Sequence, residues 1–153
     1  MRLYAYEMKR NYIGSVEEEH MHYACSNPET ADQVLKTIGI HQDEQENLVV
    51  IYLDIKNKVI GFSKVTRGLK DRSHVHPREV FKHAIERGAC NIILSHNHPS
   101  GDTTPSNQDI EVTKNIVSAG KLLGISCVDH IIVAEDLGVF KSYSIRKNGL
   151  CEF

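Results

Sequence analysis

The sequence predicts an α/β fold with a mixed β-sheet and helices packed on its faces. The apolar run 48–53 (LVVIYL) is followed by a turn-forming segment and a second strand pattern from Val59, which indicates a β-hairpin. Further along the chain, helical patterns alternate with apolar strand patterns, as in sheets whose strands are linked by helices. With 153 residues, the chain is long enough for one domain with a sizeable core.

The first part of the chain, 1–45, is predicted to be an N-terminal extension with one short helix, and 46–153 to be a single domain. The apolar residues within 3–13 are compatible with a short strand. The helix is predicted to start near Pro28, because proline is favoured at the first helical position, and to end at Gly39.

The hairpin opens the domain, and 48–53 is expected to be a central strand covered on both faces, because both alternating sets of its side chains are apolar. The remaining elements, in chain order, are a helix at 77–87, a strand at 90–94, a helix at 106–123, and strands at 125–133 and 138–145. The apolar positions of the two helices are Val80, Phe81, Ala84 and Ile85 in the first, and Ile110, Val112, Ile116, Val117, Leu122 and Leu123 in the second.

Charge and hydropathy argue against two classes of partner. The net charge is −2 and no long basic run occurs, so the electrostatic footprint of a nucleic-acid-binding protein is missing. No apolar run reaches the roughly 18 residues that a membrane span requires, and the N-terminus lacks the apolar segment of a signal peptide. The four cysteines are widely spaced, without a Cys-x-x-Cys pair, and are predicted to be reduced thiols of a cytoplasmic protein.

The stretch 95–109 combines residue types that bind catalytic metals. His96 and His98 follow a strand pattern, and residues two apart on a strand point to the same side, so both imidazoles can reach one cation. Ser106 is placed to cap the next helix, and Asp109 falls in its first turn, which returns a carboxylate toward the histidines. Two imidazoles and one carboxylate form a catalytic zinc set with a fourth position for water. Iron or cobalt also suits such a set.

A simpler interpretation of each part is a surface histidine pair and an ordinary helix cap. Two other His-x-His pairs, at 20–22 and 74–76, lack a serine and an aspartate at the corresponding distances, and we interpret them as surface or loop histidines. The combined spacing of 96–109 therefore favours a metal site there. His130 is predicted to be a hydrogen-bonded core histidine, with support of the metal site as the alternative.

The spacing His-x-His-x7-Ser-x-x-Asp of residues 96–109 resembles the JAMM signature of the JAB/MPN metalloproteases. Longer strings resemble the bacterial RadC branch in particular: HPSGD at 98–102, PS at 105–106, DIEVT at 109–113, HPREVF at 76–81 and DHIIV at 129–133. The resemblance runs from about Glu46 to near the C-terminus. It implies an MPN/JAB (cytidine deaminase-like) α/β domain with a mixed, curved sheet, and a Zn2+ ion held by His96, His98 and Asp109.

The resemblance also implies a catalytic glutamate from an upstream segment, and Glu46 lies 50 residues before His96. Glu44 and Glu79 are competing candidates, and a solvated glutamate ahead of a strand is the simpler interpretation. We assign Glu46 the acid/base role, in which it takes a proton from water and passes it to the leaving amine. Ser106 is assigned to stabilise the tetrahedral oxyanion, because a cap uses its oxygen as an acceptor and leaves the hydroxyl proton for donation.

The predicted function is a zinc-dependent metallohydrolase of the JAMM type that cleaves a peptide or isopeptide amide bond in a peptide or protein substrate. One alternative is a non-catalytic MPN scaffold that binds partners. Another is a RadC-like factor associated with DNA repair, although the low charge argues against strong phosphate binding. The sequence leaves the oligomeric state open, and a homodimer is compatible with it.

Overall fold

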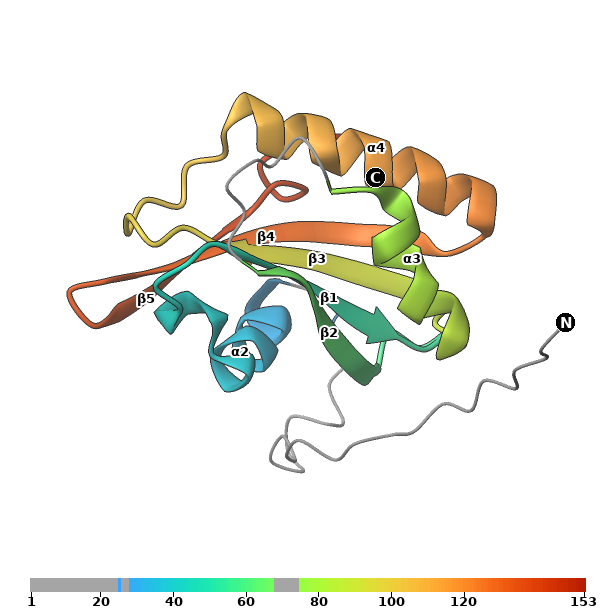
Figure 1. Ribbon diagram of the computed structural model, residues 1–153, viewed down its shortest axis with the longest axis horizontal. Coiled ribbons are helices and arrows are strands. Elements are labelled where there is room, and N and C mark those ends of the chain that lie inside the picture. The colour runs from blue at the N-terminus through green and yellow to red at the C-terminus, as the bar shows by residue number, and fades with distance from the viewer. Residues whose placement is uncertain (1–24, 26–27, 68–74) are drawn as a thin grey trace, which may run out of the picture.

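A five-stranded sheet in the order β2-β1-β3-β4-β5 forms the centre of the computed structural model, which describes residues 25, 28–67 and 75–153 (Figure 1). Its strands are β1 (Asn47–Leu53), β2 (Val59–Arg67), β3 (Asn91–Asn97), β4 (Ser126–Asp136) and β5 (Val139–Ser144). β3 and β4 run parallel and the other neighbours antiparallel, so the predicted mixed α/β sheet is confirmed. The short strand expected within 3–13 and the histidine pair at 20–22 lie outside the described residues.

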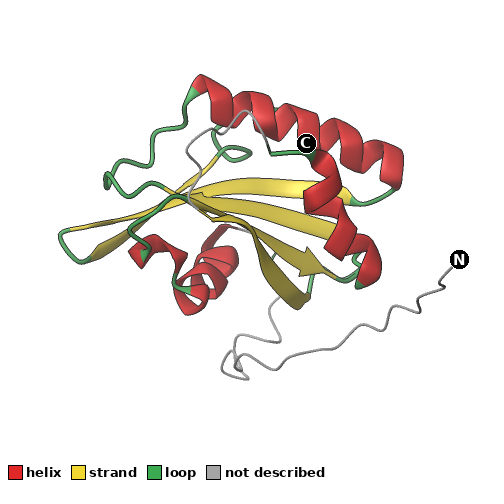
Figure 2. Ribbon diagram, in the orientation of Figure 1, coloured by secondary structure: helices red, strands yellow, loops and turns green. Residues whose placement is uncertain are grey.

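Helices cover both faces of the sheet, as Figure 2 shows. One face carries α3 (Pro77–Glu86) and α4 (Asn107–Leu123), and the other carries α2 (Pro28–Ile38) with the short 3-10 helix η1 (Ile40–Gln42). The buried side of α2 packs against β1 and β4 in an apolar core that is separate from the core under α3 and α4. The division of the chain after residue 45 stays a prediction. None of the helices in the described part combines the length and apolar character needed to cross a membrane.

β1 is buried along its whole length, which explains the run of apolar and aromatic residues from Leu48 onward. Leu48, Val50 and Tyr52 belong to the core beneath α3 and α4, whereas the alternate residues belong to the core beneath α2. A strand covered on both faces needs apolar side chains on both. β1 lies between β2 and β3, so it is an interior strand, and β3 takes the middle of the sheet.

The predicted apolar faces of the helices extend too far. In α3, Val80, Phe81 and Ala84 are buried, but Ile85 is 57% exposed because it lies one residue further round the helix than Ala84. In α4, Leu122 and Leu123 are exposed at the C-terminal end. The buried stripe of α4 consists of Asp109, Thr113, Ile116, Val117 and Gly120. Asp109 and Thr113 in this stripe are polar, so the first turns of α4 do more than pack apolar side chains against the sheet.

Candidate metal centre

Three segments, the start of β1, the end of β3 and the first turn of α4, meet at one end of the sheet. His96 lies near the end of β3 and His98 directly after it, while Asp109 lies in the first turn of α4. His96 pairs with Leu48 across the two strands, and Leu48 belongs to the core under α3 and α4, so His96 points to the α4 face. Glu46 precedes β1 and enters the same region from the neighbouring strand.

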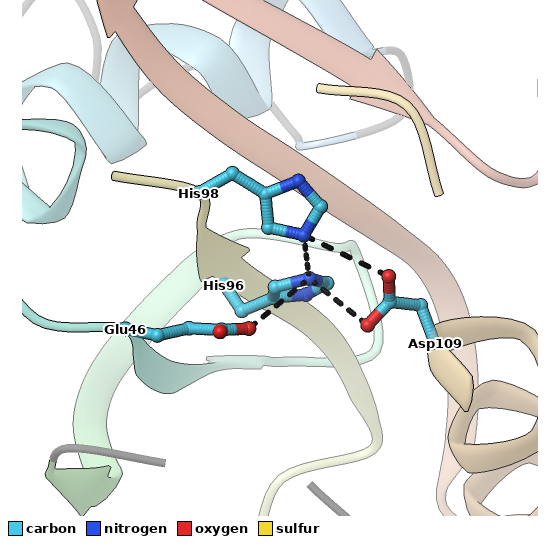
Figure 3. Close-up of side chains that lie close together, drawn as sticks. All are labelled: Glu46, His96, His98 and Asp109. Atoms are coloured by element: carbon cyan, nitrogen blue, oxygen red, sulfur yellow. Dashed lines mark hydrogen bonds and ion pairs between the residues drawn. The ribbon is translucent and has the colours of Figure 1, made fainter. Parts of the chain in front are cut away.

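The four side chains converge, with one ligand atom from each lying within 4.8 Å of the others (Figure 3). The Nε2 atoms of His96 and His98 are 2.9 Å apart. His96 Nε2 lies 3.2 Å from Asp109 Oδ1 and 3.8 Å from Glu46 Oε1, and His98 Nε2 lies 3.7 Å from Asp109 Oδ2. Both histidines and Asp109 are buried. The four groups therefore form one compact donor set of two imidazoles and two carboxylates.

The spacing of this set suits a tetrahedral cation. Zinc binds histidine nitrogen at about 2.0–2.1 Å, which places two ligand atoms of a tetrahedral site about 3.3 Å apart. The two Nε2 atoms are 2.9 Å apart, and the contacts to Asp109 are 3.2 Å from His96 to Oδ1 and 3.7 Å from His98 to Oδ2, which lie around that value. His98 Nδ1 contacts the Asp102 carbonyl at 2.7 Å, and a carbonyl only accepts, so Nδ1 carries the hydrogen of a neutral ring. The Nε2 atom of His98 then carries a lone pair that faces Nε2 of the His96 ring. A cation is the favourable neighbour for that lone pair.

Electrostatics in the set favour a positive ion at its centre. Burial would raise the pKa of the Asp109 carboxyl, but its contacts with His96, His98 and Ser106 outweigh burial and hold that pKa well below its usual range. Burial lowers the pKa of the His96 imidazolium, against the opposing effect of Asp109. A buried carboxylate beside uncharged imidazoles needs a compensating charge. The residues present therefore fit a divalent cation.

Ser106 holds Asp109 in place. It is the N-cap of α4, and its Oγ accepts from the Asp109 backbone N–H at 3.1 Å. Its hydroxyl and its own backbone N–H both donate to Asp109 Oδ2 at 2.7 Å. The Ser106 hydroxyl hydrogen was predicted to be available for an oxyanion, but in this geometry it is directed at the Asp109 carboxylate. The catalytic role of Ser106 stays a prediction, and its structural role is to orient a candidate ligand.

Among the three candidate glutamates, Glu46 is the one that joins the donor set. Glu44 is exposed, and Glu79 is exposed in α3, where it pairs with Arg78 at 3.1 Å. His76, from the second His-x-His pair, accepts from the Arg78 backbone N–H and caps α3. His74 lies outside the described residues. The structure thus brings together four of the five site residues predicted from the sequence, with Ser106 hydrogen-bonded to one of them, and the roles assigned to all five remain predictions.

Sequence reasoning missed Asn97, which fixes the segment carrying Glu46. Asn97 alternates with His96 and His98 and therefore points to the opposite face of the sheet. Its Oδ1 accepts from the Asn47 backbone N–H at 2.8 Å, and its Nδ2 donates to the carbonyls of Asp43 and Gln45 at 3.0 Å each. The available signal was an asparagine between the two histidines that follow the apolar run 92–94. One side chain thus joins the strand of the histidines to the loop that ends at Glu46.

Replacing Asn97 with alanine is expected to loosen the 43–47 segment while the rest of β1 stays intact. The change removes the acceptor of the buried Asn47 N–H and the donor to the Asp43 carbonyl, whereas the Gln45 carbonyl keeps a 3.3 Å contact from Asn47 Nδ2. Each group that stays unsatisfied costs roughly 1–3 kcal/mol. Hydrogen exchange should therefore become faster at the Asn47 amide, with little change at 49–52. Unchanged protection at Asn47 would show that Asn97 does not hold this segment.

The fold and the buried donor set define an α/β domain of the JAB type with a candidate metal centre at the end of β3. The family model of RadC-like JAB domains matches residues 25–150, and the chain belongs to this family. The resemblance inferred from the sequence is thereby confirmed. The match begins earlier in the chain than Glu46 and includes the residues of α2.

Similar curated proteins come from several bacteria. A UPF0758 protein of Caldanaerobacter subterraneus is 41% identical over 149 residues, which covers 97% of this chain and 61% of that protein. A UPF0758 protein of Bacillus cereus is 42% identical over 146 residues, covering 95% and 61%. One of Geobacillus thermodenitrificans is 48% identical over 105 residues, covering 69% and 45%. The chain spans 61% or less of the length of these relatives, and their names state no activity.

Proposed function

We propose that this protein is a metal-dependent hydrolase that cleaves the amide bond of a peptide or isopeptide, with Zn2+ held by His96, His98 and Asp109. The observation that carries the proposal is the convergence of two buried imidazoles and a buried carboxylate within ligand-to-ligand distance at the end of β3. Membership of the RadC-like JAB family supports the same chemistry. The free thiols of all four cysteines support a reducing compartment such as the cytoplasm.

When bound, the metal would supply Lewis-acid polarisation of the amide carbonyl and acidify water. Glu46 would accept the proton of the attacking water and deliver it to the leaving amine, since its carboxylate lies 3.8 Å from His96 Nε2 at the edge of the donor set. Ser106 would stabilise the oxyanion by turning its hydroxyl from Asp109 Oδ2 toward the substrate. Its backbone N–H would continue to hold the Asp109 carboxylate during that movement.

The proposal is tested by metal analysis of the purified protein, followed by a screen of peptide and isopeptide substrates. About one zinc per chain is expected for a single site with this donor set. Hydrolysis should disappear with a chelator and return when zinc is restored, which separates the metal effect from damage to the protein. Failure to bind zinc, cobalt or iron at any excess would overturn the proposal. A metal-loaded protein that binds partners but turns over no amide substrate would support the non-catalytic scaffold instead.

A further inference from the structure

A chain of short hydrogen bonds runs behind the candidate metal centre, from α4 through β4 to β3. Thr113 Oγ1 lies 2.6 Å from the Asp109 carbonyl oxygen and 2.6 Å from His130 Nδ1. His130 Nε2 in turn lies 2.8 Å from His96 Nδ1. The side chains of Thr113, His130 and His96 are all buried. This series of hydrogen bonds therefore begins at the backbone of Asp109 and ends at the ring of His96, and both residues are candidate metal ligands.

The first contact determines the direction of the others. A carbonyl oxygen only accepts, so the single hydroxyl hydrogen of Thr113 goes to Asp109. Thr113 Oγ1 must then accept from His130, which places the ring hydrogen of His130 on Nδ1. A neutral His130 consequently presents a lone pair at Nε2, which accepts from the Nδ1–H of His96. The hydrogen of a neutral His96 is thereby kept on Nδ1, and the lone pair of its Nε2 points into the donor set.

We propose that His130, held by Thr113, is a positioning residue that fixes the tautomer and ring orientation of His96 for metal binding through Nε2. This inference rests on the proposed function and assigns His130 no contact with the substrate. It also explains why α4 buries a threonine four residues after Asp109, since both residues face the sheet from the same side of the helix. A single helical turn thus provides one candidate ligand and orients a second.

A purely structural account of the same residues makes a different prediction. If Thr113 and His130 served only as hydrogen-bond partners of one another in the core, their replacement would change the stability of the protein and leave metal binding by His96 unchanged. In the positioning role, Thr113→Val removes the acceptor for His130 and allows its ring hydrogen to move to Nε2. That hydrogen would face His96 Nδ1 and move the hydrogen of His96 to Nε2, where it opposes the metal.

Two matched pairs of variants separate these accounts. The amide of His130→Gln can place an oxygen near the former Nε2 position and keep the acceptor for His96, whereas His130→Asn reaches only the Nδ1 position and loses it. Thr113→Ser keeps the hydroxyl, whereas Thr113→Val keeps the shape without it. We expect His130→Asn and Thr113→Val to weaken zinc affinity about 10–100-fold, measured by competition with a chromogenic chelator. His130→Gln and Thr113→Ser should stay close to the unmodified protein.

Two spectroscopic measurements complete the test. The visible absorption of the cobalt-loaded protein should change in His130→Asn and Thr113→Val and stay unchanged in the two conservative variants. Nitrogen NMR of the histidine rings should place the hydrogens of His96 and His130 on Nδ1 in the unmodified protein, which tests the inference even where a variant fails to fold. Hydrogens on Nε2 in these rings would overturn it.

Failure of this inference is distinguishable from failure of the proposed function. If the unmodified protein binds zinc and all four variants bind it equally, the positioning role of His130 is wrong and the metal site stands. If the unmodified protein binds no metal, the proposed function fails, and the ring NMR then reports the hydrogen-bond chain alone.

Discussion

Replacing either His96 or Asp109 with alanine is expected to release the metal from the protein. Each variant leaves two of the three proposed ligands, and a catalytic zinc site requires three protein ligands in addition to its open position. Metal analysis after gel filtration should therefore fall from about one zinc per chain to nearly none.

The second His-x-His pair provides a matched control. His76→Ala removes an exposed histidine that also precedes a proline, but this histidine caps α3 and lies outside the donor set. It should retain full zinc and lose about 1 kcal/mol of stability, as is typical for loss of a helix cap. Stoichiometric zinc in both His96→Ala and Asp109→Ala would remove the metal assignment, whatever the control does.

The elements that the sequence predicted well are those determined by local patterns. β1 is apolar on both faces and is buried on both, and the hairpin to β2 follows from the turn between them. The start of α4 was also predictable, because Ser106 and Asp109 form a capping box whose spacing is local. The donor set followed from the same cap, since the cap returns Asp109 toward the histidines.

The contacts that the sequence left open join distant segments: Asn97 was not singled out at all, and His130 was predicted as a hydrogen-bonded core histidine without its partners. Asn97 meets Asn47 across 50 residues, and this contact follows from the pairing of β1 with β3. His130 reaches His96 because β3 and β4 run parallel in a particular register, which local periodicity does not specify. The exposure of Ile85 likewise depends on how α3 packs on the sheet. Patterns in the chain identified the candidate ligands, whereas tertiary packing determined what supports them.

Glu46→Gln is expected to abolish hydrolysis while the protein keeps its metal. Glutamine has nearly the shape of glutamate but does not accept a proton at neutral pH, and the loss of a general acid/base typically lowers the rate about 10²–10⁴-fold. The three proposed ligands are unchanged, so zinc content should stay near that of the unmodified protein. Single-turnover kinetics on the best substrate from the screen, together with metal analysis of the same sample, provide the measurement.

Glu44→Gln and Glu79→Gln are the matched controls, because each makes the same chemical change at a glutamate that is exposed and outside the donor set. Both should hydrolyse substrate at the normal rate. If Glu79→Gln were the inactive variant, Glu79 in α3 would be the proton carrier and the assignment of Glu46 would be wrong. If Glu46→Gln lost its zinc as well as its activity, Glu46 would instead be a fourth ligand, since its carboxylate already lies 3.8 Å from His96 Nε2. Rate and metal content measured together therefore distinguish a proton carrier from a ligand at this position.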